Sequence, residues 1–305
     1  MVLKHFVESQ QLTPEIIFEI FERADEFRND KIHEPILNGR VLATLFYEPS
    51  TRTRLSFETA MLKLGGSVVT TENAKEFSSA VKGETLEDSI RVVSSYTDAI
   101  VMRHYEEGSA NIASSVSKVP IINAGDGKGQ HPTQALLDLY TIWLEIGRLD
   151  GLKIAIVGDL ASGRTARSLC YLLGKFPENE IIFLSPEHLK MKDDIKEYLT
   201  KHGVKFREEK NLDEVLPEVD IVYMTRIQKE RITLDEYNSA RGKYTINLNN
   251  FNLLKKSARI LHPLPKIDEI ILPIEIEDKD ERVAYFRQAE NGLYIRMALL
   301  VHLMS

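Results

Sequence analysis

Val41-Leu-Ala-Thr-Leu45 decides the fold of this chain together with the nine residues that follow it, Phe46-Tyr-Glu-Pro-Ser-Thr-Arg-Thr-Arg54. The first five residues are apolar and predict a buried strand. Residues 55–64 place apolar side chains at helical spacing and predict a helix. The polar segment therefore lies where a strand leads into a helix N-terminus, which is the connection found in parallel α/β sheets.

This junction is suited to binding an anion. A helix N-terminus offers unpaired backbone N–H groups and the positive end of the helix macrodipole. Ser50, Thr51 and Thr53 add hydroxyl donors. Arg52 and Arg54 add guanidinium groups, whose geometry matches phosphate or carboxylate. The alternative is a capping serine followed by two solvated arginines, and five such residues in succession favour the anion site.

Composition narrows the class of protein. With 305 residues, 43% of them apolar, the chain suits a globular protein with two domains of about 150 residues each. A net charge of −7 and a pI near 5.7 argue against a nucleic-acid partner, because no overall positive field attracts a polyanion. The single cysteine, Cys170, excludes an intrachain disulfide and a cysteine-based zinc cluster. No signal peptide or membrane span is predicted, and we expect a cytoplasmic protein.

Strand and helix patterns alternate along both halves of the chain. In the first half, helices are predicted from Pro14 and at 51–64, 85–96 and 132–146, with strands at 41–46, 66–70, 98–103 and 119–123. In the second half, strands are predicted at 153–157, 180–184, 204–207, 220–224, 245–248 and 259–261, before a last helix at 285–304. This alternation predicts an α/β fold of two doubly wound parallel-sheet domains.

The glycine-bounded segment 147–151 indicates the junction between the domains. We predict a first domain over residues 1–147, joined by the C-terminal helix at about 285–305, and a second domain over residues 148–284. Ligands of such folds bind beyond the carboxyl ends of the strands. We therefore expect the active site in the cleft between the two domains.

Further polar residues follow predicted strands of the first domain. Arg103 ends the strand at 98–103, where it either is solvated or faces the same anion as the Ser-Thr-Arg segment. Gly125-Asp-Gly-Lys-Gly-Gln-His-Pro-Thr-Gln134 brings His131 and Gln134 to a helix start. The positive helix end disfavours an imidazolium and leaves a neutral ring that can donate one hydrogen bond, unless His131 merely caps the helix. The polar loop at 78–82, taken alone, indicates a solvated segment.

The second domain shows a similar set. Gly158-Asp-Leu-Ala-Ser-Gly-Arg-Thr165 lacks the G-x-G-x-x-G fingerprint, and Arg164 at the helix start suits a carboxylate better than a pyrophosphate. Arg226 and Gln228, two residues apart after a strand, point the same way in extended geometry, with a solvated loop as the alternative. In Leu261-His-Pro-Leu-Pro265 the prolines cannot donate, so the segment offers carbonyl oxygens that can accept from an amine.

These residues form two sets of cationic donors, one suited to a phosphate and the other to a dicarboxylate. The sequence shows neither a nucleophile–base pair nor a metal-binding cluster, and we expect no cofactor and no metal. The chemistry indicated is positioning of two substrates and stabilisation of charge that develops on an oxygen.

The motifs resemble those of the aspartate carbamoyltransferase family, catalytic chain, along the whole sequence. Ser-Thr-Arg-Thr at 50–53 is shared by all carbamoyltransferases. Gln-His-Pro-Thr-Gln at 130–134, Met-Thr-Arg-Ile-Gln-Lys-Glu-Arg at 224–231 and His-Pro-Leu-Pro at 262–265 together are specific to the aspartate branch. The Ser-Met-Gly motif and the late cysteine expected of an ornithine enzyme are not in the sequence.

The resemblance implies transfer of the carbamoyl group of carbamoyl phosphate to the α-amino group of L-aspartate, the second step of pyrimidine biosynthesis. The implied catalytic residues are Arg52, Thr53, Arg103 and His131. The implied carbamoyl phosphate-binding residues are Ser50, Thr51, Arg52, Thr53, Arg103, His131, Gln134, Ser78 and Lys82. Within this set, Thr53, Arg103 and His131 would polarise the carbonyl oxygen, and Gln134 would hold the carbamoyl amide nitrogen.

The implied aspartate-binding residues are Lys82, Arg164, Arg226, Gln228, Pro263 and Leu264. Ser78 and Lys82 would reach the active site of a neighbouring subunit, which implies a homotrimer with shared sites and overturns the interpretation of their loop as a solvated segment. The resemblance leaves open whether regulatory chains bind.

Three positions depart from the common family pattern. Ala161-Ser162 stands where many relatives have Lys-Tyr, Val81 where a basic residue is frequent, and Lys266 where arginine is usual. These positions bear on domain closure and regulation rather than on the substrate ligands.

Two alternative functions remain open: a carbamoyltransferase for another amine such as ornithine, and a nucleotide-binding dehydrogenase or non-catalytic binding protein on the same architecture. The missing dinucleotide fingerprint and the retention of every ligand type argue against the second.

Overall fold

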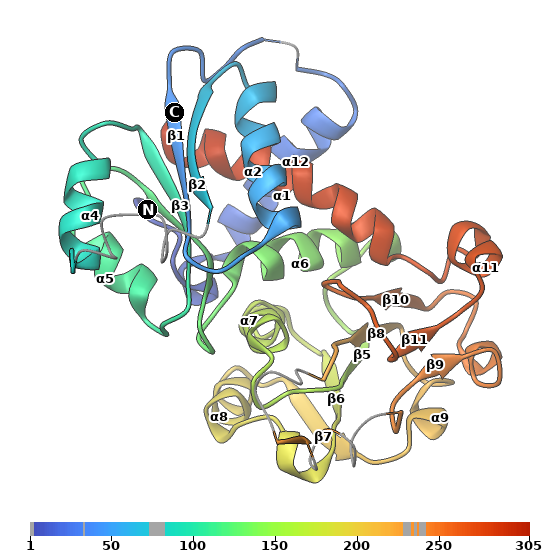
Figure 1. Cartoon of the computed structure of the whole chain (residues 1–305). Helices are drawn as coiled ribbons and strands as arrows, with labels where there is room; N and C mark the ends of the chain where they lie inside the picture. The colour runs from blue at the N-terminus through green and yellow to red at the C-terminus, as the bar shows by residue number, and fades with distance from the viewer. Residues whose placement is uncertain (1–2, 33, 73–82, 228–232, 235–236, 238–241) are drawn as a thin grey trace. The chain divides into compact units, whose positions relative to one another are not determined.

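The computed structural model describes the chain apart from residues 1–2, 33, 73–82, 228–232, 235–236 and 238–241. The chain divides into two units, the first comprising Met1–Leu137 with Glu290–Ser305 and the second comprising Asp138–Ala289. Each unit is built on a parallel sheet flanked by helices (Figure 1). The predicted α/β class with two parallel-sheet domains is confirmed, whereas the predicted boundary at residue 147 and the cleft between the domains stay predictions.

The sheet of the first unit has four parallel strands in the order β2-β1-β3-β4. Their bounds are β1 Val41–Phe46, β2 Ser67–Glu72, β3 Ala99–His104 and β4 Ile121–Asp126. From β1 the chain moves to β2 on one side and then to β3 on the other, so the winding direction reverses between β1 and β3. Such a switch point is where open α/β sheets bind ligands.

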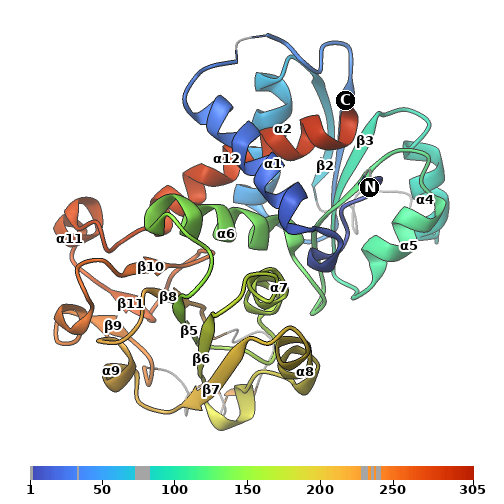
Figure 2. The same ribbon diagram turned by 180° about the vertical axis from the view of Figure 1, so that it is seen from behind.

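Helices cover both faces of this sheet. They include α1 Pro14–Arg28, α2 Thr51–Lys63, α4 Leu86–Val93 and α5 Ser109–Val116, with a short 3₁₀ turn η1 at Ser9–Gln11. The helix α6 Pro132–Ile146 begins in this unit and continues into the second, and α12 Tyr285–Met304 begins in the second unit and ends in this one. Alternate strand residues such as Ala43 and Leu45 pack with α4 and α5. Thr44, between them, points to the other face and hydrogen-bonds Glu58 of α2. α12 lies beside α1 (Figure 2), and His302 contacts Glu19 at 3.1 Å.

The sheet of the second unit has five parallel strands in the order β10-β8-β5-β6-β7. Their bounds are β5 Lys153–Val157, β6 Glu180–Leu184, β7 Lys205–Glu209, β8 Ile221–Met224 and β10 Arg259–Leu261. The helices are α7 Arg164–Leu173, α8 Asp193–Lys201, α9 Leu212–Val215 and α11 Ile274–Lys279, with 3₁₀ turns η3 Glu187–Leu189 and η5 Phe251–Leu253. The winding direction reverses between β5 and β8.

Several predicted elements differ from those observed. The helix expected at 85–96 ends at Val93, because the hydroxyls of Ser94 and Ser95 donate to main-chain carbonyls of its last turn. The strand expected at 119–123 runs from Ile121 to Asp126. The strand expected at 245–248 is reduced to β9 Ile246–Asn247, which pairs with β11 Ile270–Ile271 in a separate two-stranded sheet. None of the helices among the described residues has the length and apolar character that crossing a bilayer requires.

Candidate functional site

The N-terminus of α2 forms the first part of the candidate site. Ser50 is its N-cap residue in extended conformation, and its carbonyl accepts the Arg54 N–H at 3.2 Å. Within the described part of the chain the Ser50 hydroxyl makes no capping hydrogen bond. Thr51 and Arg52 are exposed, whereas Thr53 is buried. The predicted hydroxyl donors therefore lie at a helix N-terminus, directly after the switch-point strand β1.

The two arginines of this segment have different surroundings. Arg54 pairs with Glu72 of β2 at 2.9 Å and lies 3.9 Å from Glu58 of its own helix. It ties α2 to the sheet, and its contribution to the anion site stays a prediction. Arg52 makes no such ion pair with a described residue, and partial burial lowers the pKa of its guanidinium. Arginine stays charged in proteins, so this accessible cation is available to bind an anion.

Arg103 lies next to this segment at the end of β3. It is paired with Phe46 in the sheet register, and its carbonyl accepts the Tyr47 N–H at 2.8 Å. The Arg103 side chain is mostly buried, and its Nε lies 3.3 Å from Glu48. This placement puts the Arg103 guanidinium at the same sheet edge as Ser50.

The neighbouring His104 has a structural role. Its ring packs against Tyr47 and stacks on Tyr105, with centroid distances of 4.7 and 4.3 Å. Its Nδ1 accepts the Glu106 N–H. These contacts orient the end of β3.

The loop after β4 is fastened to the end of β3. The carboxylate of Asp126 accepts the Gln130 and Gly108 N–H groups at 2.8 and 2.9 Å. Gly127 has a φ of +47° and donates to the His104 carbonyl. A Cβ at this position would lie 2.7 Å from the Tyr105 carbonyl oxygen, so only glycine permits the approach.

This loop places His131 and Gln134 at the N-terminus of α6. The His131 carbonyl accepts the N–H groups of Gln134 and Ala135, and so caps the helix through its backbone. The His131 ring is buried, and its Nδ1 lies 3.2 Å from the Thr133 hydroxyl, which fixes the ring orientation. The structure therefore brings Ser50–Thr53, Arg103, His131 and Gln134 to one edge of the first sheet.

In the second unit, β5 and β8 end in close contact. The Thr225 N–H and hydroxyl both donate to the Val157 carbonyl. Gly158, with a φ of +117°, lies so near Thr225 that a Cβ would come 2.6 Å from its Oγ1 and closer still to its carbonyl oxygen. Arg226 follows directly. The switch point of this sheet thus positions the segment that carries Arg226.

Arg164 follows β5 at the first position of α7 and is almost fully buried. The turn before it is held by the buried Asp159, whose carboxylate accepts the Ser162 N–H at 2.9 Å. The Arg164 carbonyl accepts the Ser168 hydroxyl within α7. Arg164 and Arg226 therefore follow the two strands that flank the switch point.

Pro263 and Leu264 follow β10, the strand next to β8. Both are half-buried, and Leu264 has a φ of +55°. Lys266 pairs with Glu277 at 2.6 Å, so the lysine keeps a carboxylate partner where arginine was the expected residue. All the described aspartate-binding candidates thus lie at the carboxyl edge of the second sheet. Ser78, Val81, Lys82 and Gln228 lie outside the described residues.

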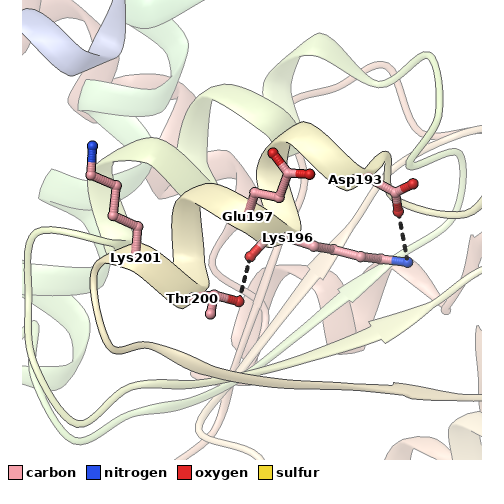
Figure 3. Close-up of a pocket in the computed structure, with 5 residues that line it drawn as sticks. All are labelled: Asp193, Lys196, Glu197, Thr200 and Lys201. Carbon is pink, nitrogen blue, oxygen red and sulfur yellow. Dashed lines mark hydrogen bonds and ion pairs between the residues drawn. The ribbon is translucent and has the colours of Figure 1, made fainter.

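The second unit has a small pocket next to the candidate site residues and a wider depression away from them. A small pocket is lined by Gly158, Thr225, Tyr244 and Glu269 among others, and so adjoins the switch point of the second sheet. A wider depression lies along one face of α8 and contains none of the predicted site residues (Figure 3). Its Lys196 and Asp193 lie 3.9 Å apart on the same helix. This charged helix surface is separate from the candidate site.

Sequence reasoning missed the residues that hold the site in shape. Asp126, Gly158 and Glu269 make the contacts that fix the site loops. Asp126-Gly127 and Gly158 carry a turn signal, because aspartate and glycine favour tight turns. Glu269 has no such signal, since its partner His262 is seven residues away in irregular chain.

Both halves of the chain match known protein families. Residues 4–144 match the family described as aspartate/ornithine carbamoyltransferase, carbamoyl-P binding domain. Residues 150–303 match the aspartate/ornithine carbamoyltransferase, Asp/Orn binding domain. The chain is 58% identical over 303 residues to aspartate carbamoyltransferase 3, chloroplastic, of Pisum sativum, covering 98% of this chain and 77% of that protein.

Two solved structures are similar along almost the whole chain. The catalytic subunit of Methanocaldococcus jannaschii aspartate transcarbamoylase aligns with a TM-score of 0.89 and 49% identity, covering 99% of this chain and 98% of that one. Aspartate transcarbamoylase from Trypanosoma cruzi, in complex with carbamoyl phosphate and aspartate, aligns with a TM-score of 0.92 and 39% identity, covering 99% and 97%. The chain therefore belongs to the aspartate carbamoyltransferase family.

Proposed function

We propose that this chain transfers the carbamoyl group of carbamoyl phosphate to the α-amino group of L-aspartate, giving N-carbamoyl-L-aspartate and phosphate, as a step of pyrimidine biosynthesis. The observation that carries the proposal is the grouping of Ser50, Arg52 and Arg103 at the switch point of the first sheet. The Trypanosoma cruzi relative, whose structure contains carbamoyl phosphate and aspartate, supports it.

The first domain binds carbamoyl phosphate in this proposal. The α2 N-terminus and the side chains of Ser50, Thr51 and Arg52 hold the phosphate. Arg103 neutralises it from the neighbouring strand. The helix N-terminus adds no proton-transfer group, so its contribution is fixed positive charge.

Three donors act on the carbamoyl carbonyl oxygen. Thr53, Arg103 and His131 donate hydrogen bonds to it, and Gln134 accepts from the carbamoyl amide. A preorganised donor stabilises a developing oxyanion more than it stabilises the ground-state carbonyl, and this difference lowers the barrier. The buried positions of Thr53 and His131 strengthen this effect, since a low local dielectric strengthens each hydrogen bond.

The second domain binds aspartate. Arg164, Arg226 and Gln228 orient its two carboxylates, and Lys82 assists from a neighbouring subunit. The carbonyl oxygens of Pro263 and Leu264 accept from the α-amine and direct its lone pair. Carboxylate recognition by arginine is bidentate, so it fixes orientation as well as affinity.

The reaction balances without a cofactor. The uncharged amine of aspartate attacks the carbamoyl carbon, and a new C–N bond forms as the carbonyl oxygen becomes an oxyanion. The oxyanion collapses, and the C–O bond to phosphate breaks. The leaving phosphate takes the proton that the amine gives up. The protein positions both substrates and stabilises the charge on oxygen.

We also propose a homotrimer in which Ser78 and Lys82 serve the neighbouring subunit's site. Its test mixes chains carrying Lys82→Ala with chains carrying His131→Ala, after dissociation and reassembly. Shared sites would regain activity, because some sites then combine native Lys82 and native His131. Sites confined to one chain would gain nothing. Sedimentation of the native assembly distinguishes a trimer from one that includes regulatory chains.

The cytoplasmic location stays a proposal. It rests on the single free cysteine, which is buried and forms no disulfide. Several relatives are named chloroplastic, so a fractionation experiment on the source cells decides the point.

A ureido assay tests the proposed reaction. Purified chain is incubated with carbamoyl phosphate and aspartate, ornithine or no acceptor. Product with aspartate alone supports the proposal. Product with ornithine but not aspartate supports a carbamoyltransferase for another amine, and no product with either supports a non-catalytic protein.

A further inference from the structure

We propose that His262 is a positioning residue that aims the Pro263 carbonyl oxygen at the aspartate amine. This inference rests on the proposed function, in which that carbonyl accepts from the amine. The His262 ring is almost fully buried and is held on both nitrogens.

The hydrogen bonds of His262 define one tautomer. Its Nδ1 lies 2.7 Å from the Leu264 backbone nitrogen and can only accept from that N–H. The ring proton must then sit on Nε2, which lies 2.7 Å from the Glu269 carboxylate and donates to it. The ring is therefore neutral and contacts the Leu264 backbone from one side.

The contact with Leu264 sets the direction of a neighbouring carbonyl. The Pro263 C=O and the Leu264 N–H belong to one planar trans peptide unit and point in opposite directions. Because His262 draws the Leu264 N–H inward to its Nδ1, the Pro263 carbonyl must point away from the ring. A rotation of this peptide would break the Nδ1 contact.

The Leu264 backbone needs such a restraint. Its φ of +55° lies in the left-handed region, which residues other than glycine seldom adopt. Conformations of this kind persist only where surrounding contacts fix them, and they gather at functional sites. The His262 contact supplies that restraint within the turn itself.

Glu269 holds the His262 proton in place. Its Oε1 also accepts the Ile267 N–H, and its Oε2 accepts the Asp268 N–H, both at 3.1 Å. Burial would raise the pKa of Glu269, but the hydrogen bond from His262 and the backbone donors lower it instead. An ionised Glu269 keeps the ring proton on Nε2 and leaves Nδ1 as an acceptor.

The backbone of His262 is anchored to the interior of the second unit. Its N–H donates to the Gln288 side chain at 2.8 Å, and Gln288 donates to Asp138 at 2.6 Å. The Tyr223 hydroxyl donates to the other oxygen of Asp138, also at 2.6 Å. These buried partners lie on α12, α6 and β8. The backbone of His262 is thus held in place at the start of the turn.

Two substitutions separate the two ring contacts. In His262→Asn the amide oxygen can take the place of Nδ1 and accept from Leu264, but the contact with Glu269 is lost. In His262→Gln the amide reaches the Nε2 position and can donate to Glu269, but the acceptor for Leu264 is lost. The proposal predicts that kcat/KM for aspartate falls about 100-fold in His262→Gln and clearly less in His262→Asn, since a small misplacement of a reacting group carries a cost of that order. The dissociation constant of carbamoyl phosphate stays unchanged in both.

Asn179→Ala is the matched control. Asn179 is fully buried in the same unit. Its side-chain oxygen accepts the Leu152 N–H, and its side-chain nitrogen donates to the Leu149 carbonyl. These residues precede β5 and β6, so they lie at the amino edge of the sheet, opposite the site. It should lower the Tm without changing KM for aspartate. Equal losses of kcat/KM for aspartate in His262→Gln and His262→Asn, or a rise in KM for aspartate in the control as well, would overturn the proposal.

A measurement on the unaltered protein covers the case in which the variants do not fold. The ¹⁵N NMR shifts of labelled histidine rings should show His262 as a neutral ring protonated on Nε2. A ring protonated on Nδ1 would overturn the proposal. If the wild-type chain forms no carbamoyl aspartate, the proposed function fails, whereas wild-type activity with unaffected His262 variants refutes only this inference.

Discussion

Gly158→Ala tests whether close contact between β5 and β8 shapes the aspartate site. Gly158 has a φ of +117°, and an added Cβ would lie 2.6 Å from the Thr225 Oγ1 and still nearer its carbonyl oxygen. Relief of this overlap has to move the Thr225 backbone, which carries Arg226. The substitution therefore acts on stability and on the site together.

Two costs add in this variant. The positive φ costs an alanine about 1–2 kcal/mol. The overlap costs about 1–3 kcal/mol more, as overpacking does in well-packed interiors. We expect the free energy of unfolding to fall by about 3 kcal/mol, which corresponds to a Tm lower by roughly 10 °C in a unit of this size. Displacement of Arg226 should raise KM for aspartate about tenfold, with carbamoyl phosphate affinity unchanged.

Gly203→Ala is the matched control. Gly203 has a φ of +72°, and apart from its two chain neighbours none of the described residues has a heavy atom within 4 Å of the position that a Cβ would take, so alanine there meets the backbone cost alone. Calorimetry gives the two Tm values, and initial rates of ureido product over a range of aspartate concentrations give KM. If Gly158→Ala matches Gly203→Ala in both, the close contact does not shape the site and the reasoning is refuted.

Three further outcomes follow from the contacts described. Arg52→Gln should weaken carbamoyl phosphate binding about 10- to 100-fold, because charge-assisted hydrogen bonds are lost. Arg54→Gln should leave this affinity intact and lower the free energy of unfolding by about 1 kcal/mol. Calorimetric titration measures the affinity of both variants, and thermal unfolding measures their stability. His131→Ala should lower kcat by about 100- to 1,000-fold with carbamoyl phosphate still bound, as loss of one oxyanion donor does. Burial would raise the pKa of Glu145, but hydrogen bonds from Arg287 and Arg259 lower it below its ordinary 4.5. Ionised Glu145 therefore stabilises the fold above pH 4.5, and Glu145→Gln should cost about 2 kcal/mol at pH 7.

Each of these outcomes can fail in a defined way. Equal loss of carbamoyl phosphate affinity in the Arg52 and Arg54 variants would show that both arginines bind the anion. Unchanged turnover in His131→Ala would remove His131 from the oxyanion donors. The stability gap between wild type and Glu145→Gln should narrow as the pH falls through the lowered pKa, because the wild-type carboxylate then becomes protonated. A gap that is constant with pH would show that its charge does not contribute.

The sequence was sufficient to predict the fold class because its apolar periods are strong. Strands such as 153–157 and 180–184 and the helix 132–146 match the observed bounds. The small β9–β11 sheet was not predictable in the same way. Its two-residue strands carry no period, and their pairing depends on how the surrounding loops pack.

Sequence rules place some residues of the candidate site but not others. The strand-end rule gathers Arg103 and His131 at one edge without any knowledge of contacts. Glu58, four residues after Arg54 on the helix, is an ion-pair signal that the interpretation of Arg54 as an anion donor did not weigh. The hydrogen bond between His262 and Glu269 accompanies a left-handed turn at Leu264, and no local sequence pattern predicts that conformation.

Isotope-labelled substrates test the central claim most directly. ¹³C-carbamoyl phosphate and ¹⁵N-aspartate are incubated with the wild-type chain, and the product is followed by NMR while phosphate release is measured in parallel. The account predicts a product with one-bond ¹³C–¹⁵N coupling that forms in step with phosphate. Phosphate release without this coupling would mean hydrolysis rather than transfer, and would contradict the account.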